Sequence, residues 1–300
     1  MWPILFALVA SPELLTDSKI GNLVRLSPTL YCGASPAADG AFAELAARGV
    51  RTVVSVDGAE PDAARAKRHG LRYVHLPIGY DGVPSSRILE LAKLFREAKG
   101  PIFIHCHHGR HRAPAAVAAA AVAAGLLKTK EAEAAMKLAG TGAEYLGLWK
   151  SMREAVPVSA ERLAGLNVDY REQVAPPPLA AAMLKLDERL ESLRRKPTAE
   201  DALLLKEGLA ELARLPETAT RPQEYRRLLE ANQLAAEELE TDLRSGKPTA
   251  AALKLTTKAC DACHRKHRDV GQTALGGSWR GRFTIGRAAV SRENSSLPGN

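Results

Sequence analysis

Pro101-Ile-Phe-Ile-His-Cys-His-His-Gly-Arg-His-Arg-Ala-Pro114 is the stretch that decides the fold. Residues 101–105 form a short apolar run with β-branched members, which predicts a buried strand. Residues 113–124 are almost all alanine and valine, which indicates a buried helix. A loop between a strand and a helix N-terminus points backbone N–H groups into one concavity. Such a loop suits a phosphate- or sulfate-like anion.

The loop contains a nucleophile and a cation that can hold the anion. Cys106 is the expected nucleophile, because the loop and the helix N-terminus favour its thiolate. Arg112 follows after five intervening residues and can bind two oxygens of the anion. The residues expected to bind the substrate beside them are His107, His108, Gly109, Arg110 and His111.

His105-Cys106-x5-Arg112 resembles the signature of the cysteine-dependent protein tyrosine and dual-specificity phosphatases, over about residues 22–155. The resemblance implies hydrolysis of phosphate monoesters through a phosphocysteine intermediate. Ala113 stands where that family usually has serine or threonine, whose hydroxyl assists departure of the thiolate. Breakdown of the intermediate is therefore expected to be slow. The nature of the phosphorylated substrate stays open.

The same resemblance implies an aspartic acid that protonates the leaving oxygen. Asp81 is the expected acid, 25 residues before the cysteine on a loop flanked by Gly79 and Gly82. Asp57, at the end of the preceding predicted strand, is the alternative. A rhodanese-like sulfur transfer at Cys106 is a further interpretation, although the rhodanese loop usually closes one residue sooner.

Strand and helix patterns alternate through the N-terminal half of the chain. This alternation predicts an α/β domain with a mostly parallel sheet and helices on both faces, and with Cys106 at the carboxyl end of a strand. The predicted strands are 30–36, 51–56, 71–77 and 101–105. The predicted helices are 37–48, 61–69, 85–98, 113–124, 130–138 and 143–155.

A second domain is predicted after a connector. Residues 156–178 have little periodicity and end in three prolines, which indicates a semi-rigid linker. The remainder shows apolar stripes at helical spacing with short connections, which predicts an all-α four-helix bundle over residues 179–268. Its predicted helices are 179–195, 198–215, 222–245 and 248–267.

The last of these helices contains Cys260-Asp-Ala-Cys263-His264, the attachment pattern of a c-type haem. Both cysteines share a helical face and can form thioethers to the haem, and His264 can bind the iron. The bundle resembles the cytochrome c-prime group. One covalent haem c is therefore expected, with Met183 either as a sixth ligand or as an apolar core residue. A redox dithiol and a zinc half-site are the alternatives.

Composition and charge limit the remaining classes. The net charge of +8 suits an anionic substrate, and no basic stretch is interleaved with aromatic residues, so nucleic acid is not an expected partner. No integral membrane span is expected, because the apolar N-terminal run is too short. Residues 1–10 resemble the apolar part of a secretory signal that lacks its usual positive start; a hydrophobic strand is the alternative. Residues 1–21 are assigned to this N-terminal segment, and residues 269–300 to a disordered basic tail.

The haem motif and the apolar start together predict a periplasmic protein, because C-x-x-C-H systems attach haem outside the bacterial cytoplasm. In that oxidising compartment Cys106 is prone to oxidation, with Cys32 as its expected internal partner. The leading hypothesis is a phosphatase coupled to a haem domain that senses redox state or a gas, or that passes electrons to a redox partner. The alternative is an electron-transfer or sensor cytochrome with a weak, anion-binding phosphatase-like domain.

Overall fold

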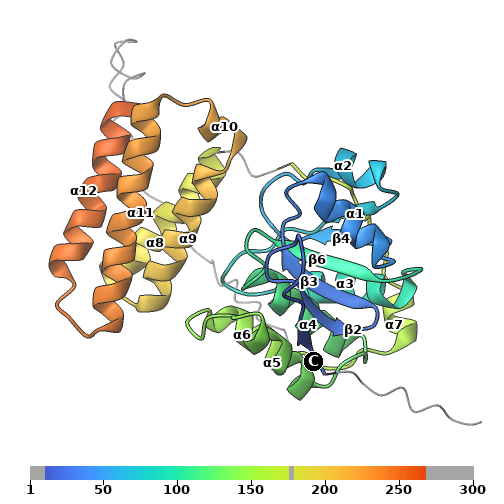
Figure 1. Ribbon diagram of the computed structural model, residues 1–300. Coiled ribbons are helices and arrows are strands. Elements are labelled where there is room, and N and C mark those ends of the chain that lie inside the picture. Colours follow the sequence, from blue (N-terminus) through green and yellow to red (C-terminus); the bar gives the residue numbers. More distant parts are fainter. Residues whose placement is uncertain (1–10, 176–178, 268–300) are drawn as a thin grey trace, which may run out of the picture.

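The computed structural model describes residues 11–175 and 179–267, which form two units that lie side by side (Figure 1). The sheet unit comprises residues 11–175, and the helical unit comprises residues 179–267. The segments 1–10 and 268–300, with the apolar run of the predicted signal and the whole of the predicted tail, lie outside the described residues. Within the described residues, no helix is both long enough and apolar enough to cross a membrane.

The sheet unit is built on a mixed sheet whose described strands have the order β1-β2-β3-β6-β4-β5. Strands β3, β6, β4 and β5 are parallel neighbours, and β1 and β2 add an antiparallel edge. The predicted α/β fold is confirmed, but the two antiparallel strands were not predicted, and β1 lies within the segment 1–21. The strands are β1 (Glu13–Leu14), β2 (Val24–Ser27), β3 (Leu30–Ala34), β4 (Thr52–Ser55), β5 (Arg72–His75) and β6 (Ile102–Cys106).

Strand β6 lies between β3 and β4, and all of its residues are buried. Its side chains alternate between two hydrophobic cores: Phe103 joins one, and Ile102 and Ile104 join the other. A strand covered on both faces reads as a continuous apolar run, which is why the sequence identifies it so clearly. Helices α1 and α2 cover the first face, and α3 to α6 cover the second.

The helices of the sheet unit are α1 (Asp39–Ala47), α2 (Ala63–Arg68), α3 (Ser85–Glu97), α4 (Arg112–Ala123), α5 (Thr129–Leu138), α6 (Leu146–Arg153) and α7 (Ala160–Ala164). Helix α4 is central among them, since every one of its residues is buried. Its alanines let α3, α5, α6 and the sheet approach closely from several sides. A helix enclosed in this way gives the preceding loop a rigid support.

Residues 156–175 differ from the expected connector, because they contain α7 and pack onto the sheet unit. Leu163 is buried in the larger core. The Tyr170 hydroxyl donates a hydrogen bond to the Glu90 carbonyl at 2.7 Å, and the Val174 N–H donates to Nδ1 of His75 at 3.0 Å. Residues 156–175, whose apolar residues show no periodicity, are therefore a segment packed on the surface of the sheet unit, called the strap below.

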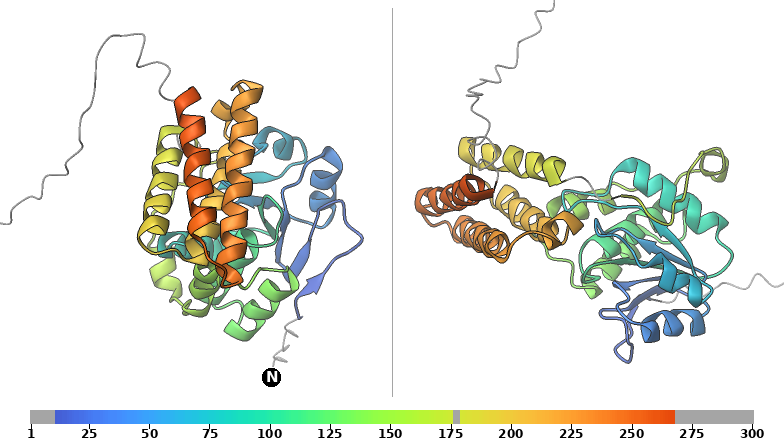
Figure 2. Two further views of the ribbon diagram at one scale, coloured as in Figure 1. Left: turned by 90° about the vertical axis from the view of Figure 1, so that its left-hand side faces the viewer. Right: turned by 90° about the horizontal axis from the view of Figure 1, so that it is seen from above.

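The helical unit consists of α8 (Leu179–Arg195), α9 (Ala199–Ala213), α10 (Pro216–Ala219), α11 (Gln223–Arg244) and α12 (Ala250–His267). It has a leucine-rich core of its own, and α9 packs between α8 and α11 (Figure 2). Gly208 permits the close contact of α8 with α9, since a Cβ at that position would lie 2.5 Å from Leu186 Cδ2. Helix α9 faces the sheet unit (Figure 1), and α8 also reaches it through Arg189, which pairs with Asp81.

Candidate active site

The Cys106 loop lies between a strand end and a helix start, as the sequence predicts. Cys106 is the last residue of β6, and Arg112 is the first residue of α4. Both side chains are buried, with relative exposures of 3% and 1%. The chain turns at Gly109, whose φ is +69°, and a Cβ there would lie 2.2 Å from the carbonyl carbon of Gly33. Only glycine fits this approach of the loop to β3.

Polar side chains outside the loop hold it in place. Asn22 donates one hydrogen bond to the Gly109 carbonyl at 2.9 Å and another to the Ala139 carbonyl at 2.8 Å. The Thr141 hydroxyl donates to the Arg110 carbonyl at 2.7 Å. The loop is thereby tied to the turn before β2 and to the segment after α5. Neither Asn22 nor Thr141 was predicted, because nothing in the sequence relates them to the loop.

The histidines around the loop have different environments. His105 is buried, and burial lowers its pKa to about 4; its Nε2 contacts the Tyr73 hydroxyl. His111 stacks on Tyr145 with ring centres 4.1 Å apart, and burial lowers its pKa to about 4 as well. These two imidazoles are therefore neutral at pH 7. The other two, His107 and His108, are exposed, and their rings lie 4.1 Å apart between centres at an angle of 60°.

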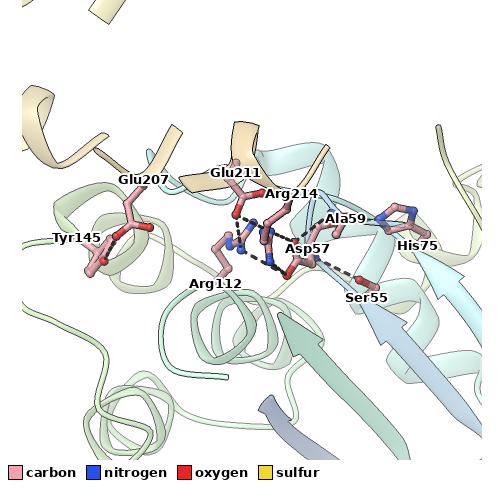
Figure 3. Close-up of polar contacts among 9 residues, drawn as sticks. All are labelled: Ser55, Asp57, Ala59, His75, Arg112, Tyr145, Glu207, Glu211 and Arg214. Atoms are coloured by element: carbon pink, nitrogen blue, oxygen red, sulfur yellow. Dashed lines mark hydrogen bonds and ion pairs between the residues drawn. The ribbon is translucent and has the colours of Figure 1, made fainter. Parts of the chain in front are cut away.

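The guanidinium of Arg112 is surrounded by groups that stabilise its charge. It lies 3.6 Å from Oδ2 of Asp57 and 3.0 Å from Oε1 of Glu211 (Figure 3). It also lies 4.2 Å from the centre of the Tyr80 ring. Burial alone would lower the pKa of Arg112, but Glu211, then Tyr80 and Asp57, raise it above its ordinary value. The arginine is a permanent cation at the base of the site.

Asp57 is a buried carboxylate shared by two arginines. Arg214, directly after α9, donates to both of its oxygens, at 2.5 and 3.2 Å, and Arg112 approaches from the other side. Burial opposes its ionisation, but Arg112 and Arg214 together hold the pKa of Asp57 well below its usual range. A carboxylate held in this way has no proton to donate at neutral pH.

Asp81 lies on the exposed loop after β5, and its side chain is 62% exposed. Among the described residues no hydrogen bond or ion pair joins it to Cys106 or Arg112, and its charged neighbour is Arg189 of α8 at 3.5 Å. The loop nevertheless reaches the site, because the preceding Tyr80 covers Arg112. The structure therefore places Asp81 at the edge of the site.

Two residues of α9, and Arg214 directly after it, complete the surroundings of the site and were not predicted. Glu211 and Arg214 contact Arg112 and Asp57, and Glu207 accepts a hydrogen bond from the Tyr145 hydroxyl at 2.8 Å (Figure 3). Their spacing puts them on one helix face, which in a sequence is typical of a solvated face. No signal distinguished them from exposed charges.

The cysteines of the haem motif line an apolar cavity of about 50 Å³ inside the helical unit. His264 and Met183 line the same cavity, together with leucines of α8, α9 and α11. Burial, and secondarily Asp261, raises the pKa of Cys260 to about 11, and burial also raises the pKa of Cys263. These thiols differ from a reactive dithiol, whose attacking cysteine has a lowered pKa. Within the described residues, no group of three or more histidine, cysteine or acidic side chains converges as a metal site.

Residues 29–126 match the family model described as "Polymorphic toxin system, DSP-PTPase phosphatase". The dual specificity protein phosphatase TpbA of Pseudomonas aeruginosa strain UCBPP-PA14 is 38% identical over 93 residues, which cover 30% of this chain and 42% of that protein. TpbA of strain PAO1 is 37% identical over the same length. The chain thus spans about two fifths of the length of these relatives.

Solved structures are similar to the same part of the chain. A TpbA structure in complex with phosphotyrosine has 26% identity and a TM-score of 0.38, and the alignment covers 48% of this chain and 97% of that one. A structure of a Shewanella putrefaciens protein described as a "Putative phosphatase (DUF442)" has 19% identity and a TM-score of 0.38, and the alignment covers 45% of this chain and 89% of that one. The range of the family match includes Cys106 and Arg112, and the sequence matches support a cysteine-dependent phosphatase domain of the dual-specificity type in this part of the chain.

Proposed function

We propose that the chain hydrolyses phosphate monoesters through a phosphocysteine at Cys106. The observation that carries the proposal is the strand–loop–helix geometry, with Cys106 at the end of β6, a left-handed Gly109 in the turn and Arg112 at the start of α4. The match of residues 29–126 to dual-specificity phosphatases supports it.

The reaction has two displacements at phosphorus. The Cys106 thiolate attacks phosphorus, the bond from phosphorus to the ester oxygen breaks, and the leaving oxygen takes a proton from Asp81. A water molecule then attacks the phosphocysteine, its proton passes to the Asp81 carboxylate, and the thiolate leaves with phosphate as the product. Arg112 and the loop amides balance the charge on the oxyanion in both steps. The loop of Asp81 contains Gly79 and Gly82, which lets its side chain approach the leaving group.

The test is hydrolysis of p-nitrophenyl phosphate by the wild-type chain and by Cys106→Ser. The serine variant should be inactive, because its hydroxyl stays protonated where the thiol forms a thiolate. It should still bind tungstate, since Arg112 and the loop amides are unchanged. Full activity in this variant would exclude Cys106 as the nucleophile.

We infer that the helical unit is a cytochrome c-prime-like four-helix bundle with one haem c. The fit is chemical: Cys260 and Cys263, three residues apart, and His264 line one apolar cavity with Met183. The cysteines would hold the group by thioethers and His264 would bind its iron, which would supply redox or gas-binding chemistry. The cavity of about 50 Å³ is smaller than ordinary ligand sites, so α8 and α9 must separate to admit the macrocycle.

A pyridine haemochrome spectrum of the purified chain tests this proposal, with the double variant Cys260→Ala/Cys263→Ala as its control. The wild-type chain should give the haem c spectrum and a mass increased by one haem, and the variant should give neither. The proposed periplasmic location follows from the same chemistry. Recovery of a tagged chain in the cytoplasm without haem would contradict both.

A second function is favoured by the contact of Arg112 with Glu211 and by Ala113. In this alternative the sheet unit only binds anions, and the chain acts as an electron-transfer or sensor cytochrome. Tungstate binding without turnover of any aryl phosphate, in a chain that carries haem, would support it.

A further inference from the structure

Helix α9 places a carboxylate on the arginine of the anion-binding loop. Oε1 of Glu211 lies 3.0 Å from a terminal nitrogen of Arg112 and 2.7 Å from a terminal nitrogen of Arg214. The guanidinium that it contacts is 99% buried. Because a buried arginine binds carboxylates and phosphates through the same N–H groups, Glu211 holds the position of a phosphate oxygen.

The charges around Glu211 form a closed group. Arg112 and Arg214 provide two positive charges, and Asp57 and Glu211 provide two negative charges. Each arginine lies within ion-pair distance of both carboxylates. A phosphate dianion added to this group would lie within a few ångströms of the Glu211 carboxylate, where like charges repel strongly in a poorly solvated site. The substrate and Glu211 therefore compete for Arg112.

We propose that Glu211 is an internal competitor of the substrate, and that α9 must withdraw from the Cys106 loop before a phosphate ester binds. The proposal rests on the proposed phosphatase function and adds its regulation. Cys106 is 3% exposed while α9 is docked, which agrees with a closed site.

The docked position of α9 depends on Leu203, which is buried in the larger core of the sheet unit, and on a few polar contacts that can be broken. Besides Glu211, these are the Arg214 pair with Asp57, the hydrogen bond from Tyr145 to Glu207 at 2.8 Å, and, through the neighbouring α8, the Arg189 pair with Asp81 at 3.5 Å. Interfaces within a chain that are mostly polar are typical of units that move relative to each other. Withdrawal of α9 would also remove the Leu203 side chain from the core of the sheet unit.

The opposite face of α9 reaches the apolar cavity inside the helical unit. Leu205 and Leu209 line the cavity beside Cys260 and Cys263, whereas Glu207 and Glu211 point to the sheet unit. Residues two apart on a helix lie about 200° apart, so one rigid helix contacts both sites. A displacement of α9 at the cavity would therefore move Glu211 relative to Arg112.

The experiment measures tungstate affinity by calorimetry in the full-length Cys106→Ser chain, so that turnover is not required. Glu211→Gln keeps the shape and removes the charge, and Glu230→Gln, at an exposed position of α11, is the matched control. Glu211→Gln should bind tungstate about 10-fold more tightly, and the control should bind as the parent does. Equal or weaker binding by Glu211→Gln would overturn the proposal, because Glu211 would then position Arg112 instead of competing for it.

The same substitution in the active chain gives a second readout. Relief of competition should lower KM for p-nitrophenyl phosphate about 10-fold and leave kcat nearly unchanged. A fall in kcat without a change in KM would also overturn the proposal. If the wild-type chain hydrolyses nothing but Glu211→Gln still tightens tungstate binding, the phosphatase proposal fails while the competition by Glu211 stands.

Discussion

Asp57→Asn is the substitution that best separates the two roles of this residue, a proton donor or a counter-charge for arginines. It keeps the side-chain shape and removes one negative charge that lies 2.5 Å from Arg214 and 3.6 Å from Arg112. Removal of one partner from a buried ion pair costs about 3–5 kcal/mol. Both arginines keep Glu211, so we expect a loss of about 2 kcal/mol in the free energy of unfolding of the sheet unit.

A loss of that size should lower the thermal midpoint at pH 7 by about 4–8 °C. The lowered pKa of Asp57 determines how its contribution to the free energy of unfolding changes with pH. The stabilisation is present above the unfolded-state pKa of about 3.9 and is lost as the pH falls below it toward the folded-state pKa. The wild-type and variant midpoints should therefore converge in acid. Asp169→Asn is the control, because its ion pair is exposed and should contribute little.

The rates of the same variant test the catalytic role. As a counter-charge, Asp57 positions Arg112 in both chemical steps, so its replacement should slow p-nitrophenyl phosphate and a poor leaving group such as phenyl phosphate by the same factor, about 10-fold. An unchanged midpoint together with a loss confined to phenyl phosphate would refute this reasoning and would make Asp57 the general acid.

Three further predictions follow from other residues of the site. Asp81→Asn should slow phenyl phosphate by about 10²–10⁴-fold and p-nitrophenyl phosphate much less, because a good leaving group departs without a proton; equal losses would remove Asp81 from this role. Burial lowers the pKa of His105 to about 4 in the folded chain, whereas the unfolded-state pKa is about 6.5. As the pH falls through this range, the unfolded chain binds a proton at His105 before the folded chain does. The free energy of unfolding should therefore drop by about 3 kcal/mol between pH 6.5 and 4. Thermal midpoints across this range should show a flatter profile in His105→Gln. Peroxide should oxidise the two thiols of Cys32 and Cys106 to a disulfide with release of water, and dithiothreitol should restore activity; a peptide map without the linked pair, or activity that reduction leaves unchanged, would argue against it.

The geometry relevant to the last prediction is close to the limit for a disulfide. Cys32 pairs with Ile104 across β3 and β6, so Cys106 is its diagonal neighbour on the same face of the sheet. Diagonal neighbours lie about 7–8 Å apart, slightly beyond the usual Cα separation of a disulfide. Formation of the bond therefore requires a movement of the loop after β6.

The sheet unit was largely predictable because its signals are local. The apolar run 101–105 and the alanine-rich run 113–124 correspond to a strand and a helix with no exposed face, and these patterns do not depend on the rest of the chain. The edge strand β1 was missed because a strand of two residues has no periodicity to detect, and β2 was missed because its alternation spans only four residues. The strap 156–175 was missed for a related reason, since its contacts with His75 and Glu90 join segments about 80 to 100 residues apart.

The part of the site that comes from α9 could not be predicted, because a carboxylate on a helix surface is satisfied equally well by water and by an arginine. The sequence shows that Glu207, Glu211 and Arg214 share a polar face, but it does not show what that face contacts. The need for some anion could be inferred: an arginine at the start of a fully buried helix must have a counter-charge, since an unpaired buried charge costs several kcal/mol. In this structure the chain itself supplies that anion through Asp57 and Glu211. The affinity of Arg112 for a phosphate ester is therefore a difference between two free energies. One is the free energy of the contacts that the ester gains in the loop, and the other is that of the contacts that Glu211 gives up.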